Sequence, residues 1–99
     1  MPLAIHLQPD QLRLVQTILQ AHIPGRQVCA FGSRVLGTAK PASDLDLCIM
    51  GEDRLPPAAI DSLRFAFSDS VLPMKVDVVE WAGLKENFRR IIRDSSLAV

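Results

Sequence analysis

Apolar residues recur every three to four positions in three segments of this chain, which is the spacing of an amphipathic helix. The first segment starts at Pro9 and stops at Pro24, and the second spans residues 58–70. The third spans residues 84–94 and is predicted to fray into residues 95–99, because terminal residues are commonly poorly ordered. The apolar faces of these helices comprise Leu12, Val15, Ile18 and Leu19; Ile60, Leu63 and Phe67; and Leu84, Phe88, Ile91 and Ile92.

Three shorter apolar runs predict strands, because they are too short for independent helices and the last is rich in valine. These runs are residues 28–31, 44–50 and 75–81. Residues 33–36 fit about one helical turn that Gly37 stops. The alternation of helices and strands predicts one small sheet with helices packed on it. The short connection between the first two strands favours their antiparallel pairing.

Composition limits the kind of protein this can be. Ninety-nine residues, 48% of them hydrophobic, predict a single domain over residues 1–99 with one core. The net charge is zero and the pI is 6.7, so the chain lacks the basic surface of an autonomous nucleic-acid binder. The sequence has no apolar run of membrane-spanning length, and its first six residues do not resemble a signal peptide, which predicts a cytoplasmic protein.

Gly32 and Ser33 follow the first predicted strand and form a candidate phosphate-binding turn. Glycine lets the main chain approach a ligand closely, because it has no side chain in the way. The free amides at the start of the following helical turn, together with the Ser33 hydroxyl, suit phosphate oxygens.

Asp44 and Asp46 follow the Gly-Ser pair after a spacer of ten residues, 34–43. They are two positions apart on a predicted strand, so both carboxylates point to one face and lie roughly 6.5 Å apart along it. Such a pair is able to bridge two magnesium ions. Asp77 lies among valines in the third predicted strand, where a carboxylate is costly unless something pairs with it. A metal held jointly by the three aspartates would remove that cost.

These residues resemble the minimal nucleotidyltransferase (MNT) family of the DNA polymerase β-like superfamily. The similarity covers roughly residues 9–94 and is carried by the Gly-Ser pair with the arginine after it, by Ser43 with the two aspartates after it, and by the valine-flanked Asp77. It implies an α+β (mixed α/β) fold, a small nucleotidyltransferase core whose mixed sheet of about three or four strands carries packed helices.

The resemblance, together with the motif, predicts a Mg²⁺-dependent nucleotidyltransferase that uses ATP or another NTP, with two ions bound. The predicted metal ligands and catalytic residues are Asp44, Asp46 and Asp77, and the predicted nucleotide contacts are Gly32, Ser33, Arg34 and Ser43. By resemblance, the chain is an antitoxin that forms a hetero-oligomer with a HEPN-type RNase toxin and transfers AMP to a toxin tyrosine.

Two other functions compete with this one. A chain with the same fold but no activity would mask its partner by contact alone, since retained motifs can be idle. A transferase acting on RNA ends is disfavoured by the neutral charge, which also argues against stable direct binding of nucleic acid.

Several other residues have simpler structural interpretations. Cys29 and Cys48 are predicted to be two reduced, buried thiols on neighbouring strands. Trp81 is predicted to be a core residue at a strand end, with partner binding as the alternative. The basic last helix is expected to present a solvated face, with contact to a partner or to phosphates as the alternative; its arginines are Arg89, Arg90 and Arg93.

Overall fold

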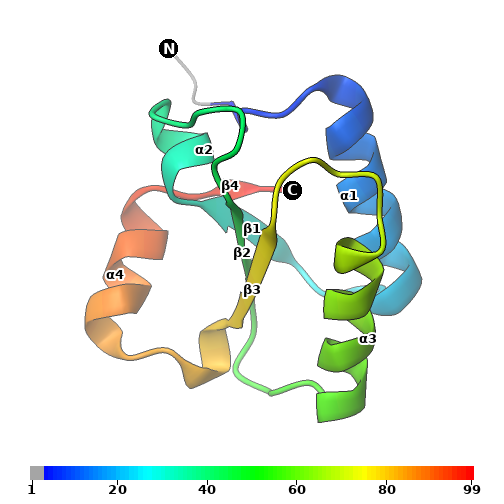
Figure 1. Cartoon of the computed structure of the whole chain (residues 1–99). Coiled ribbons are helices and arrows are strands. Elements are labelled where there is room, and N and C mark those ends of the chain that lie inside the picture. The colour runs from blue at the N-terminus through cyan, green and yellow to red at the C-terminus, as the bar shows by residue number, and fades with distance from the viewer. Residues whose placement is uncertain (1–3) are drawn as a thin grey trace.

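The structure, a computed structural model, describes residues 4–99 (Figure 1). Within these residues the helices are α1 (Pro9–His22), α2 (Ser33–Leu36), α3 (Pro57–Ser68) and α4 (Glu86–Asp94), with a 3₁₀ turn, η1 (Trp81–Gly83), before α4. The strands are β1 (Val28–Phe31), β2 (Leu45–Ile49), β3 (Val76–Glu80) and β4 (Leu97–Ala98). The segments predicted to be helices and strands are therefore present, with bounds that differ by a few residues.

The four strands form one mixed sheet in the order β3-β2-β1-β4. β1 pairs antiparallel with β2 and with β4, whereas β2 pairs parallel with β3. The parallel pair needs a crossover connection, and α3 provides it. The α+β class, the mixed sheet and the antiparallel first pair are thus confirmed.

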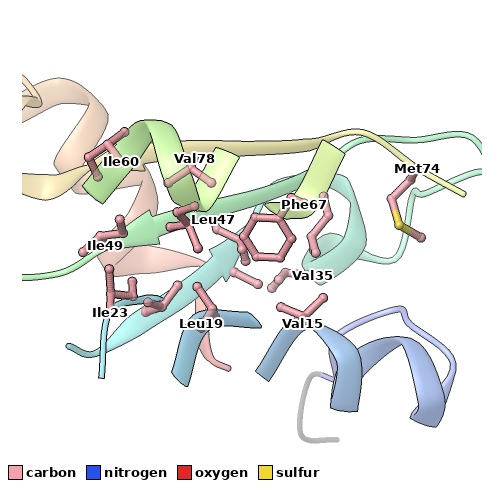
Figure 2. Close-up of a cluster of buried hydrophobic side chains, with 14 residues drawn as sticks. Val15, Leu19, Ile23, Val35, Leu47, Ile49, Ile60, Phe67, Met74 and Val78 are labelled. Atoms are coloured by element: carbon pink, nitrogen blue, oxygen red, sulfur yellow. The ribbon is translucent and has the colours of Figure 1, made fainter. Parts of the chain in front are cut away.

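The helices cover the two faces of the sheet unequally. α1 and α3 pack together on one face, and α4 lies across the other (Figure 1). Figure 2 shows side chains from α1, α3 and the strands pointing toward one another in the larger core, among them Val15, Leu47, Phe67 and Val78. A smaller cluster on the α4 face contains Phe31, Cys48 and Ile92.

Side chains of β2 alternate between these two faces. Leu45, Leu47 and Ile49 are at most 1% exposed and belong to the core under α1 and α3. Cys48 belongs to the α4 face, so Asp46, two residues before it, points to that face as well. The alternation predicted from the sequence is confirmed, and it directs the acidic side chains away from the main core.

The C-terminal segment differs from its prediction. Residues 95–99 do not fray, because Leu97 and Ala98 pair with β1 and the Val99 amide donates to the Val28 carbonyl over 3.0 Å. Without this short strand the second edge of β1 would be open, and its backbone groups would lose these partners.

The buried face of α4 also differs from the apolar face predicted for the last helix. Ile92 is buried, but Ile91 is 56% exposed and Leu84 lies before the helix. Trp81 is only half-buried, and its ring stacks against the Arg89 guanidinium at 4.9 Å from the ring centroid. The tryptophan therefore belongs to the surface of the smaller cluster, with a cation–π contact in place of full burial.

The two cysteines occupy opposite positions of the β1–β2 pair and are both buried and free, as predicted. In the part of the chain that the structure describes, no helix is both long and apolar enough to cross a membrane.

Replacing Leu63 by alanine tests the main core. Leu63 is fully buried on α3, so the change should lower the free energy of unfolding by about 2–5 kcal/mol. Phe65→Ala on the same helix is the control, because Phe65 is 70% exposed and should cost no more than about 0.5 kcal/mol. Urea denaturation measures both, and equal losses would place the core elsewhere.

Candidate active site

A glycine turn joins β1 to α2 and lies against the side chain of Asp46. Gly32 has φ +80° and ψ −155°, a conformation that residues with a side chain rarely adopt. A Cβ atom at this position would lie 2.5 Å from Asp46 Oδ2. Glycine is therefore required here for two reasons, the backbone conformation and the close approach of the carboxylate.

Ser33 begins α2 directly after this turn and is half-buried. The amides of Val35 and Leu36 donate to the Gly32 carbonyl, both over 3.0 Å. These two hydrogen bonds fix the turn to the first residues of α2. The first amides of a helix have no intrahelical acceptor, and together with the Ser33 hydroxyl they supply donors for an anion.

Three aspartates lie in or directly before two neighbouring strands, β2 and β3. Asp46 lies in β2 opposite Phe31, the last residue of β1, and Asp44 precedes β2 by one residue. Asp77 in β3 is the register partner of Asp46 in the parallel pair. Partners in adjacent strands point to the same face, so Asp46 and Asp77 stand side by side on the α4 face.

The electrostatics of Asp46 reflect this crowding. Burial raises the pKa of its carboxyl above the ordinary value, and the negative charges of Asp77 and then Asp44 raise that pKa further. Repulsion between the three carboxylates therefore acts across the site when no cation is present. Burial is the largest cause of the raised Asp46 pKa, and the neighbouring charges add to it.

The side chains as they lie do not form a finished metal cage. Among residues 4–99, no three His, Cys, Asp or Glu side chains are gathered closely enough to hold an ion. Asp77 Oδ1 is 3.6 Å from Lys75 Nζ, an ion pair at the surface. The prediction that all three carboxylates stand at metal-bridging distance is thus not met by this arrangement, in which Asp77 pairs with Lys75.

The chemistry of the donors still fits magnesium. Mg²⁺ prefers carboxylate oxygens and retains several waters, so it needs only a few protein ligands. Asp44, Asp46 and Asp77 supply such oxygens on one face, and a divalent cation would offset the repulsion that raises the Asp46 pKa. These three residues would hold the ion if it binds here.

Two of the residues predicted to contact nucleotide have their polar groups engaged within the protein. The Arg34 side chain is 4% exposed, and its guanidinium donates to backbone carbonyls, including those of Ser43 and His6. The Ser43 hydroxyl accepts from the Lys40 amide over 2.8 Å. The prediction that Arg34 contacts phosphate is therefore wrong for this arrangement, because the guanidinium points into the protein. Arg34 instead holds a loop.

Lys75 is the residue near the site that the sequence interpretation missed. Its signal was available, since Lys75 and Asp77 are two positions apart in one extended segment and so share a face.

Residues 12–99 match the family described as "Nucleotidyltransferase domain". The chain belongs to this nucleotidyltransferase family. It is also 49% identical over 89 residues to "Probable protein adenylyltransferase MntA" of Haemophilus influenzae, a match that covers 90% of this chain and 78% of that protein.

Solved structures share the fold. One is a crystal structure of a mutant MntA–HpeT toxin–antitoxin, with a TM-score of 0.72 and 22% identity over 94% of this chain and 72% of that one. Another is a crystal structure of a toxin–antitoxin with AMP-PNP, with a TM-score of 0.73 and 23% identity over 87% of this chain and 69% of that one. At this level of identity the likeness establishes the shared architecture.

Substitution of Gly32 tests the turn. Gly32→Ala should strain the backbone and displace the Asp46 carboxylate, so Mg²⁺-dependent binding of AMP-PNP should be lost. Gly37→Ala is the matched control, because Gly37 has φ +82° but nothing lies within 4 Å of an added Cβ. This variant should lose about 1–2 kcal/mol of stability through backbone strain alone and keep nucleotide binding. Calorimetric titration separates the two, and intact binding by the Gly32 variant would move the phosphate site away from this turn.

Asp46→Asn tests the electrostatic strain. A carboxyl whose pKa is raised by folding favours the folded state below its ordinary pKa and loses that contribution as the pH rises through the folded pKa. In the metal-free protein the variant should therefore melt a few degrees higher than wild type at neutral pH, and the difference should vanish as the pH falls toward 4. Asp61→Asn, at an exposed position of α3, is the control. A destabilised Asp46 variant at neutral pH would contradict this assignment.

Proposed function

We propose that this chain is a protein adenylyltransferase that acts as the antitoxin of a toxin–antitoxin pair. It would transfer AMP from ATP, in the presence of Mg²⁺, to a tyrosine hydroxyl of a HEPN-type partner. The observation that carries the proposal is the contact of the Gly32 turn with Asp46, beside Asp77. The 49% identity to a probable protein adenylyltransferase supports the same activity, and the fold shared with a toxin–antitoxin solved with AMP-PNP supports the nucleotide class.

Each part of the site has a separate role in this reaction. The Gly32-Ser33 turn would hold the β- and γ-phosphates, which leave as pyrophosphate. Asp44, Asp46 and Asp77 would hold Mg²⁺, which when bound neutralises charge on the phosphates and on the attacking oxygen. Asp77 would also accept the proton of the acceptor hydroxyl.

The acceptor would approach Asp77 from an open side of the protein. Asp77 lies on β3, which is an edge strand of the sheet. A cavity of about 620 Å³ adjoins this edge on its α3 side, with Arg64 and Lys75 contributing positive charge to its lining. Because in-line transfer requires the attacking oxygen to be held near the α-phosphorus, a partner protein that binds at this edge would supply both the hydroxyl and its position.

A contact-only antitoxin remains the second candidate. The observation that favours it is the separation of the three carboxylates, with Asp77 paired to Lys75. Such a protein would use the same fold to cover its partner and would transfer nothing.

The Asp44→Asn/Asp46→Asn double variant separates these functions. It removes two carboxylate ligands and nearly preserves side-chain volume, so binding of the partner should persist while AMP transfer falls by at least about a hundredfold. The measurement combines co-purification of the partner, incubation with labelled ATP and Mg²⁺, mass spectrometry of both chains, and survival of cells that express the toxin.

The Lys85→Gln variant is a control, because Lys85 is exposed and precedes α4 outside the predicted site. Loss of both transfer and cell protection in the double variant, with the partner still bound, supports the enzyme. Full protection by the double variant would establish the contact-only function instead.

A further inference from the structure

The side chain of Arg34 has no role in the proposed chemistry, although it is the one buried charged side chain among residues 4–99. We infer that Arg34 is a positioning residue, which fixes the distance between the phosphate turn and the acidic residues. This inference rests on the proposed function, because it assigns the turn and the carboxylates to one nucleotide site.

The decisive contact joins the two ends of the spacer between the motifs. The spacer runs from Arg34, the residue after Ser33, to Ser43, the residue before Asp44. Arg34 Nε donates to the Ser43 carbonyl over 3.0 Å. One hydrogen bond therefore links the neighbour of the phosphate-binding serine to the neighbour of the first acidic residue, and closes the ten-residue loop between them.

The other guanidinium nitrogens secure the same loop and a further segment. Nη2 donates to the Pro41 carbonyl over 3.0 Å, with the Lys40 carbonyl at 3.4 Å. Nη1 donates to the His6 carbonyl over 2.8 Å, and the His6 amide donates back to the Arg34 carbonyl over 2.7 Å. The loop is thus attached at three of its carbonyls to α2, the helix that the phosphate turn starts.

The energetics indicate why arginine is needed. A buried cation is costly unless its hydrogen-bonding groups are satisfied, and carbonyl oxygens satisfy them here. In the described part of the chain no carboxylate lies within 4.0 Å of this guanidinium. Only a planar group with several donors in fixed directions reaches carbonyls on separate segments, whereas a lysine ammonium is a single point.

Positioning has a direct consequence for nucleotide binding. A Mg²⁺–nucleotide complex touches the turn and the carboxylates together, so its affinity depends on the distance between them. Loops without such a tie are the mobile parts of a fold, and a displacement of about 1 Å at a reacting site costs roughly a hundredfold in rate.

The test compares Arg34→Lys with Arg26→Lys. Arg26 is a matched control, because its guanidinium also holds loop carbonyls, those of Met50 and Asp53, but at the opposite end of the β1–β2 pair. Both variants should lose stability. At a temperature where both are fully folded, Arg34→Lys should weaken binding of AMP-PNP with Mg²⁺ by about tenfold or more, which corresponds to about 1.4 kcal/mol, and Arg26→Lys should stay within about twofold of wild type.

Hydrogen exchange supplies a second measurement that does not depend on catalysis. The amides of residues 38–40 and 42–44 should exchange faster in Arg34→Lys and keep wild-type rates in Arg26→Lys. Equal nucleotide affinities and equal exchange in the two variants would overturn the inference and leave Arg34 with a general structural role. If wild type binds AMP-PNP and the two variants show these differences, but wild type transfers no AMP, the proposed function fails while the positioning role stands.

Discussion

The site depends on the antiparallel register of β1 and β2. This register sets Phe31 opposite Asp46, so the turn that ends one strand lies beside the carboxylate of the next. The contact is close enough that Gly32 has no room for a side chain against Asp46 Oδ2. The parallel pairing of β2 with β3 then adds Asp77 on the same face. A slip of one residue in either pair would point these carboxylates to the other face, into the main core.

The arrangement is electrostatically unfavourable without a cation, and this links structure to function. The Asp46 carboxyl is partly desolvated and faces two other acidic groups, which its raised pKa reports. Selection for stability alone would remove this repulsion between carboxylates. Residues that serve a binding site are commonly kept although they lower the stability of the fold. Here the ion pair of Lys75 with Asp77 offsets a part of it at the surface. This repulsion is the physical reason why a divalent cation would be favoured at the proposed site.

The sequence predicted the parts of the fold that follow from local pattern. The alternation along residues 44–50 gave the orientation of Asp46, and the short spacer gave the antiparallel pair. Pairing of Leu97 and Ala98 with β1 was not predicted, because two residues carry no periodicity and their stability comes from a distant strand. The exposure of Ile91 was also missed, since the buried face of a short helix is chosen by what it packs against.

The candidate site residues divide in the same way. Gly32, Ser33 and the three aspartates were predicted from residue type and spacing, which reflect chemistry. The direction of the Arg34 side chain was not predictable, because its acceptors are backbone carbonyls of a loop whose path the sequence leaves open. An arginine next to a phosphate turn suggests a phosphate contact, and only the folded loop shows that the guanidinium is already engaged.

The most direct test of the account is the thermal unfolding of the wild-type chain with Mg²⁺ and AMP-PNP together, compared with each alone. A ligand held jointly by the turn and the carboxylates stabilises the folded state by about 2.7 kcal/mol at a hundred times its dissociation constant. The account predicts a rise of several degrees in the melting temperature that requires both components. Unchanged melting with both components at millimolar concentration would contradict the assignment of Gly32, Ser33, Asp44, Asp46 and Asp77 to one nucleotide site.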